Sequence, residues 1–215
     1  RLFLGTASHS GRTLVRSPSF LLLVSTVLPS QLAAQPPLRG TTEMLAALDG
    51  RAPEYAGLAK QIWALAELGY QETRSSALLQ QQLSAAGFSL TTGAAEMPTA
   101  FIASYGQGRP VIAILGEFDA LPGLSQGAVP VRQVLADGGP GHGCGHHLFG
   151  TASAAAAIAV KDWLLARGGQ GTIRFYGTPA EEGGGGKVYL VRAGLFKDVD
   201  AVVAWHPGDA NQVSK

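Results

Sequence analysis

Apolar residues recur along the chain with spacings that predict alternating helices and strands. After Pro53, apolar positions from Leu58 onward fall at helical spacing as far as Gly69, and a second helix is predicted over 75–86. An Ala-rich helix over 148–167 and a shorter one over 186–193 follow. Strands are predicted over 100–105, 111–115, 172–176 and 200–205. The continuous apolar run at 111–115 favours a strand that is buried on both faces, and 200–205 is expected to form a last buried strand.

The order of these elements predicts the fold class. Strand, helix, strand, helix, strand is typical of an α/β fold with a mainly parallel sheet flanked by helices. Such sheets bind ligands outside the carboxyl ends of their strands. Three strands are followed at this end by polar residues, which are Glu117 and Asp119, Glu181 and Glu182, and His206. We therefore expect these side chains to meet at one edge of the sheet.

An apolar run over residues 20–28 is too short to span a bilayer. Arg12 and Arg16 precede it, and small residues up to Ala34 follow, so the pattern indicates a secretory signal peptide over 1–35. The alternative is a buried strand or helix. The expected location is secreted or periplasmic, without membrane association once the signal is removed, and the folded domain is expected over 41–215.

Composition narrows the class of protein and the role of the cysteine. The 215 residues suit one medium-sized domain, and a net charge of +1 with 46% hydrophobic residues indicates neither disorder nor nucleic-acid binding. The single cysteine excludes an internal disulfide. Cys144 is therefore a buried apolar residue, a reactive thiol or a metal ligand.

A Gly-rich loop places Cys144 and His146 two residues apart. In an extended segment both side chains can point to one side and reach one metal or two adjacent metals, and the glycines let the backbone approach closely. Taken alone, the same pattern also describes a flexible loop with a free thiol. His206, after an apolar strand, is either a ligand at the same edge or a structural residue. Thiolate, imidazole and carboxylate together suit zinc, manganese, cobalt or iron.

Glu181 and Glu182 are adjacent, and adjacent side chains diverge. One carboxylate can then bind a metal while the other removes a proton from an activated water and donates it to a leaving amine. Without the other groups, two neighbouring glutamates would indicate only a solvated acidic turn.

Four ordered motifs carry a resemblance to a known family, and they are Gly116–Gly123, His142–His146, Pro179–Gly184 and Trp205–Pro207. Together they resemble the aminoacylase-like metallopeptidases and amidohydrolases, in the branch of p-aminobenzoyl-glutamate hydrolase and the plant hydrolases of indole-acetyl-amino acids. The resemblance runs from about Leu58 to the end of the chain.

The resemblance implies a dinuclear zinc-peptidase-like site with two divalent metal ions, zinc or manganese and otherwise cobalt. The implied ligands are Cys144, which bridges the metals, His146, Glu182 and His206. Glu181 is implied as the general base, and Asp119 as a carboxylate behind the site that orients a ligand. More distant members have a histidine ligand two residues before that aspartate; Glu117 stands there, so the ligand role is not carried over.

The implied activity is hydrolysis of an amide bond in N-acyl or N-aroyl amino acids or small peptides, by a homodimer when full length. Because members insert a lid or dimerisation domain after the histidine strand, we expect residues 41–215 to be the N-terminal part of the catalytic domain, truncated before that insertion. Two alternatives remain. One is a thiol hydrolase with Cys144 as nucleophile and His146 or His206 as base, which leaves the two glutamates unexplained. The other is a non-catalytic metal-binding relative or an inactive fragment.

Overall fold

The computed structural model describes residues 40–210 and 212, so the expected signal segment lies outside the described residues. Its helices are α1 (Thr41–Gly50), α2 (Ala52–Leu65), α3 (Thr73–Ala85), the 3-10 helix η1 (Ala94–Glu96), α4 (His146–Arg167), α5 (Glu181–Gly184) and α6 (Gly186–Arg192). Its strands are β1 (Ser89–Thr92), β2 (Phe101–Gln107), β3 (Val111–Gly116), β4 (Gly171–Gly177) and β5 (Ala201–Val203). Each helix and strand predicted above is present, with ends shifted by a few residues.

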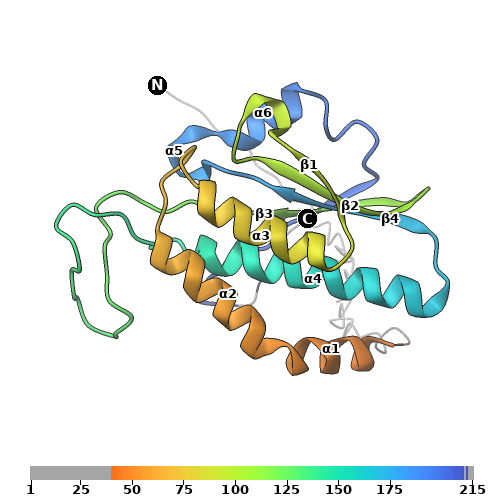
Figure 1. Cartoon of the computed structure of the whole chain (residues 1–215), viewed down its shortest axis with the longest axis horizontal. Coiled ribbons are helices and arrows are strands. Elements are labelled where there is room, and N and C mark those ends of the chain that lie inside the picture. Colours follow the sequence, from red (N-terminus) through yellow and green to blue (C-terminus); the bar gives the residue numbers. More distant parts are fainter. Residues whose placement is uncertain (1–39, 211, 213–215) are drawn as a thin grey trace, which may run out of the picture. The chain divides into compact units, whose positions relative to one another are not determined.

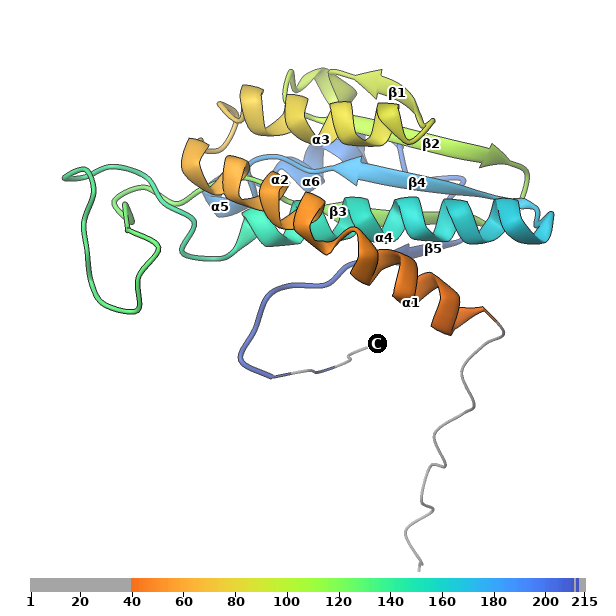
Figure 2. The same cartoon turned by 60° about the horizontal axis from the view of Figure 1, so that its bottom comes forward.

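The five strands form one mixed sheet in the order β1-β2-β4-β3-β5. β3 runs parallel to both β4 and β5, whereas β2 runs antiparallel to β4 and β1 antiparallel to β2. The expected α/β class, with helices flanking the sheet, is confirmed. The parallel strands are the three that the polar residues follow, so their carboxyl ends meet at one edge. Figure 2 shows β4 pointing toward the end of the sheet where α4 begins.

The two faces of the sheet bury different side chains because residues along a strand alternate in direction. Phe175 of β4 faces α2, α3 and α4 and stacks on Phe101 of β2, with ring centroids 5.5 Å apart. The next residue, Tyr176, points to the opposite face and stacks on Phe196 at 4.5 Å. Figure 1 shows α1 to α4 on one side of the sheet and α6 on the other. Most of the hydrophobic core therefore lies under α2, α3 and α4.

Helix α4 is the central helix of the larger layer and packs against β3 and β4. Among the described residues it alone is long and apolar enough to cross a membrane, but half of its apolar window is buried inside the protein. Gly150 permits its close approach to the sheet, because a Cβ at that position would lie 2.6 Å from the carbonyl oxygen of Glu117. This contact sets the start of α4 against the end of β3.

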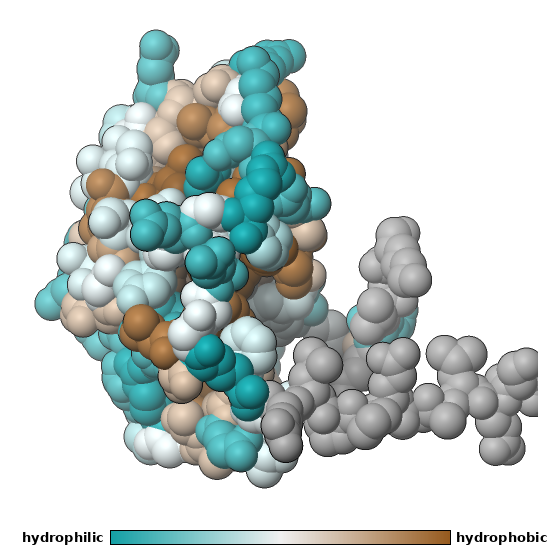
Figure 3. All heavy atoms as spheres, turned by 90° about the vertical axis from the view of Figure 1, so that its right-hand side faces the viewer, coloured by the Kyte–Doolittle hydropathy of each residue, from teal (hydrophilic) through white to brown (hydrophobic). Residues whose placement is uncertain are grey.

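One strand differs from its prediction. Residues 200–205 were expected to form a buried strand, but β5 covers only Ala201–Val203 and all three of its residues are exposed. Val202 and Val203 are 50% and 53% exposed. The reason is that β5 lies at the edge of the sheet, with β3 as its only strand neighbour among the described residues. Figure 3 shows the side of the molecule where α4 ends, and this side carries hydrophilic residues interspersed with apolar ones.

Candidate metal centre

The segments that follow three strands, together with the start of α4, deliver the candidate groups to the same edge of the sheet. Glu117 to Asp119 follow β3, Glu181 and Glu182 follow β4, and His206 follows β5. His146 is the first residue of α4, after Gly145 in the left-handed conformation with φ 80°. The structure thus brings together all six residues that the sequence singled out, which are Asp119, Cys144, His146, Glu181, Glu182 and His206.

His146 lies at the centre of the group and is fully buried. Its Nδ1 lies 2.9 Å from Asp119 Oδ1. An ionised carboxylate only accepts hydrogen bonds, so Nδ1 carries the hydrogen and, in the neutral ring, Nε2 presents a lone pair. That Nε2 lies 3.9 Å from an oxygen of Glu181 and 3.9 Å from an oxygen of Glu182. Asp119 therefore orients His146 toward the two glutamates.

His206 presents its ring in the same way. Its Nδ1 lies 2.8 Å from the carbonyl oxygen of Pro207, which can only accept, so its Nε2 is left as the acceptor. This Nε2 lies 3.4 Å from His146 Nε2 and 3.3 Å from Cys144 Sγ. The three atoms form a group within 4.8 Å of one another. Ligand bonds of about 2.1 Å meeting at a tetrahedral angle would place two nitrogens about 3.4 Å apart, so the spacing suits a metal ion.

Within the described part of the chain, two buried carboxylate oxygens have no hydrogen-bond partner, and they belong to Glu117 and Glu182. A buried polar atom without a partner costs about 1–3 kcal/mol, and a cation is one partner that removes this cost. Glu117, His146 and Glu181 also form a second group within 4.8 Å. The donor set, with its lone pairs directed inward, therefore fits divalent cations.

The electrostatics agree with a cation site. Burial acts to lower the pKa of His146, but its contacts with Asp119 and Glu117 outweigh burial and raise that pKa to about 10. Burial, and then the carboxylate of Glu182, raises the pKa of Cys144 to about 11. Both groups hold a proton that a divalent cation would displace. A raised pKa is also the opposite of what an activated thiol nucleophile requires.

The two adjacent glutamates lie in different surroundings. The side chain of Glu181 is 45% exposed, whereas that of Glu182 is 17% exposed. The backbone N–H of Glu182 donates to Asp119 Oδ2 at 2.8 Å. The backbone also departs from helical angles at Glu182 and Gly183. These differences separate the two carboxylates, as two distinct roles would require.

Three further residues contribute to the centre: Glu72 and Lys187, which the sequence did not indicate, and Glu117, which the sequence placed at this edge without a role. Fully buried Glu72 accepts a 2.8 Å hydrogen bond from the backbone N–H of Ala180, which has a left-handed φ of 54° just before Glu181. Glu117 contacts His146 from the end of β3, and Lys187 from α6 contacts Glu117. The sequence offered a signal only for Glu117, which lies two residues before Asp119. Nothing in the sequence distinguished Glu72 from other acidic residues that precede a helix.

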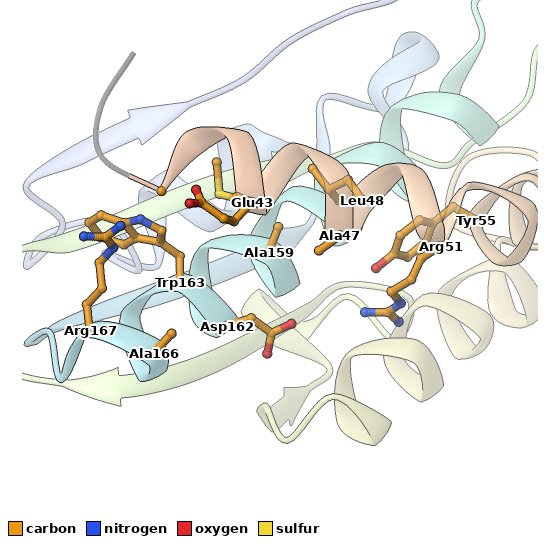
Figure 4. Close-up of a pocket in the computed structure, with 12 residues that line it drawn as sticks. Glu43, Ala47, Leu48, Arg51, Tyr55, Ala159, Asp162, Trp163, Ala166 and Arg167 are labelled. Carbon is orange, nitrogen blue, oxygen red and sulfur yellow. The ribbon is translucent and has the colours of Figure 1, made fainter. Parts of the chain in front are cut away.

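A separate hollow of about 460 Å³ lies between α1, the start of α2 and the C-terminal half of α4 (Figure 4). At one end the guanidinium carbon of Arg167 lies 5.2 Å from the centre of the Trp163 ring, and at the other that of Arg51 lies 4.9 Å from the centre of the Tyr55 ring. Among the described residues, the groups of possible metal ligands lie elsewhere, at the N-terminus of α4. The chemistry therefore belongs to the sheet edge and not to this hollow.

Comparisons with known proteins agree with this assignment. The model of peptidase family M20/M25/M40 matches residues 113–214. Over 162 residues the chain is 52% identical to one of the subunits of p-aminobenzoyl-glutamate hydrolase from Escherichia coli (strain K12), with 75% of this chain and 34% of that protein covered. It is 33% identical over 151 residues to an IAA-amino acid hydrolase of Arabidopsis thaliana, with 70% of this chain and 33% of that protein covered.

Among solved structures, a dinuclear metal-binding peptidase of the M20 family from Bacillus subtilis superposes with a TM-score of 0.57 at 28% identity. The match covers 73% of this chain and 42% of that one. The chain spans about a third of the length of the curated relatives named above.

Proposed function

Because the chain belongs to peptidase family M20/M25/M40, we propose that the full-length protein is a metal-dependent hydrolase of amide bonds. Its proposed substrates are N-acyl or N-aroyl amino acids or small peptides. The names of the relatives support this class, since one acts on p-aminobenzoyl-glutamate and another on conjugates of an amino acid.

In this proposal, two divalent metal ions are held by Cys144, His146, Glu182 and His206. When bound, such ions activate a water molecule for attack and polarise the carbonyl of the amide bond. Glu181 takes the proton of the attacking water and delivers it to the leaving amine, as its partly exposed carboxylate permits. Asp119 accepts one hydrogen bond from Nδ1 of His146 and another from the backbone N–H of Glu182, and so holds both residues at the site.

The observation that carries the proposal is the convergence of ligand atoms from separate segments at one point of the sheet edge. His146 and His206 each have the Nδ1 hydrogen directed to an oxygen, and their Nε2 atoms lie 3.4 Å apart. This spacing suits two nitrogens bound to a metal ion, which would displace the proton that His146 holds. Zinc or manganese is proposed, because thiolate, imidazole and carboxylate ligands suit both, and cobalt is an alternative.

Two variants test the proposal in the full-length protein. Glu181→Gln should abolish hydrolysis of N-acyl amino acids while the protein keeps its metal, because the base is lost and the ligands are not. Cys144→Ser should lose metal and activity together. A chelator should stop the wild-type reaction. Activity that survives chelation and is stopped by alkylation of Cys144 would contradict the proposal in favour of a thiol hydrolase. A metal-loaded protein without turnover on any N-acyl amino acid would favour a non-catalytic relative.

Export and dimerisation are proposed as well. The signal-like pattern over 1–35 supports export, and protein recovered from the periplasm or the medium should then begin near Gln35. A cytosolic product that retains residues 1–34 would contradict export. A homodimer should show twice the monomer mass by light scattering, and the monomer mass at micromolar concentration would contradict it.

A further inference from the structure

Glu117 is a buried carboxylate with one oxygen held and the other directed into the candidate metal centre. We propose that Glu117 is an additional metal ligand through Oε2, and that Lys187 holds its other oxygen so that the carboxylate binds through one oxygen only. This inference rests on the proposed metal centre. It assigns roles to two residues that the resemblance to the family does not supply.

The first step is the unpartnered oxygen. Glu117 is 5% exposed, and its Oε2 has no hydrogen-bond partner among the described residues. That oxygen lies 2.9 Å from Nε2 of His146. Nδ1 of His146 directs its hydrogen to Asp119, so Nε2 of His146 and Oε2 of Glu117 are the two atoms that a metal ion at this position would meet. A divalent cation that displaces the proton of His146 would therefore lie within reach of Glu117 Oε2 as well.

The second step is the spacing. Two ligand bonds of about 2.1 Å that meet at a right angle place their atoms about 3.0 Å apart. The 2.9 Å between Glu117 Oε2 and His146 Nε2 matches this edge. Glu181 has an oxygen within 4.8 Å of both atoms. Since the single lone pair of His146 Nε2 serves one ion, Glu117 would join the ion that His146 binds.

The third step is the role of Lys187. Its Nζ donates to Oε1 of Glu117 from the second residue of α6, and its side chain is 32% exposed. The ammonium group therefore occupies the oxygen that faces away from His146. It keeps the carboxylate from turning to bind through both oxygens, and it offsets one negative charge in a centre that also contains Glu181 and Glu182.

The test is cobalt(II) binding by the full-length protein, because the visible absorption of cobalt reports the number and kind of its ligands. The number of bound ions and their affinities are measured by competition with a chelator for wild type, Glu117→Gln and Lys187→Met. Glu43→Gln, which alters an exposed glutamate of α1, is the control. Circular dichroism checks folding, and Glu117→Asp retains a carboxylate in case the glutamine variant does not fold.

We expect Glu117→Gln to weaken one of the two ions by at least about tenfold and to change the cobalt spectrum, as loss of a ligand would. Glu117→Asp should bind more tightly than Glu117→Gln. Lys187→Met should keep both ions but shift the spectrum, and this shift should vanish when Glu117→Gln is also present, since Lys187 acts only through Glu117.

Two cobalt ions bound by Glu117→Gln with wild-type affinity and spectrum would overturn the inference and leave the metal centre intact. An unchanged spectrum in Lys187→Met would overturn the role of Lys187. A folded wild-type protein that binds no cobalt would instead overturn the proposed function on which the inference rests.

Discussion

Replacing Asp119 with asparagine tests how the protein orients its central histidine. Asp119 is 1% exposed and accepts two hydrogen bonds, from Nδ1 of His146 at 2.9 Å and from the backbone N–H of Glu182 at 2.8 Å. An asparagine offers one oxygen and one NH₂ group. Whichever way the amide is turned, its NH₂ group faces one of the two donors. The variant keeps the size of the side chain but must lose one hydrogen bond.

The magnitude follows from the burial of the pair. A buried donor left without an acceptor costs about 1–3 kcal/mol. If the NH₂ group faces His146, the ring can satisfy it only by moving its hydrogen from Nδ1 to Nε2, which directs that hydrogen into the centre. If it faces Glu182, the backbone N–H of Glu182 loses its acceptor, and residue 119 no longer holds the segment that carries both glutamates. Either outcome should lower metal affinity by about 10- to 100-fold, the usual cost of losing the partner of a ligand.

The assay is metal affinity by competition with a chromophoric chelator, with thermal unfolding measured on the same metal-free samples. Asp137→Asn changes an exposed aspartate in the loop before the cysteine and is the matched control, which should keep wild-type affinity. Asp119→Asn protein that folds and binds metal as tightly as wild type would refute the argument that Asp119 orients His146.

Three further predictions concern protons and packing. The pKa values of His146 and Cys144 are raised to about 10 and about 11, so metal binding should release protons and become tighter as pH rises from 6 to 9. Calorimetry in buffers of different ionisation enthalpy measures the number of protons released. A metal affinity that does not change with pH would contradict this prediction. Burial raises the pKa of Glu72 above its ordinary value of 4.5, so the stability linked to its proton is present below pH 4.5 and is lost as pH rises through the folded-state pKa. Urea unfolding should therefore show that Glu72→Gln gains stability relative to wild type as pH rises. Parallel plots of stability against pH for the two proteins would refute this. Gly150→Ala should lower the free energy of unfolding by about 1–3 kcal/mol, because its Cβ would lie 2.6 Å from a backbone oxygen. Gly57→Ala, whose Cβ would meet nothing within 4 Å, should raise the free energy of unfolding by about 0.5–1 kcal/mol. Equal effects of the two variants in urea unfolding would contradict the close approach of α4 to the sheet at Gly150.

Helices and strands were predictable where the spacing of apolar residues along the chain was enough to indicate the type of element. The apolar run 111–115 forms β3, whose core residues are buried, and the Ala-rich stretch after the cysteine loop forms α4. The same reasoning was wrong for the burial of β5, because an apolar run does not reveal whether a strand lies inside a sheet or at its edge. Periodicity also gives no strand direction, so the antiparallel pairing of β2 with β4 was not predictable.

The candidate centre was predictable to the extent that its residues follow strands or stand close together in the sequence. Cys144 and His146 are two residues apart, and Glu181 and Glu182 are neighbours, so local spacing alone suggested shared chemistry. Glu72 was not predictable, because 108 residues separate it from Ala180, whose backbone it holds. Such a contact depends on how α3 packs beside the end of β4, and no local pattern contains that information.

The central claim is a two-metal centre at the carboxyl ends of β3, β4 and β5. Anomalous diffraction from crystals of the zinc-loaded full-length protein tests it most directly. We expect two zinc peaks, with Cys144 Sγ, Nε2 of His146 and His206, and an oxygen of Glu182 at bonding distances of about 2.0–2.3 Å. Glu181 should remain outside bonding distance of either ion. Absence of zinc from this edge of the sheet, or zinc bound by Glu181 in place of Glu182, would contradict the account.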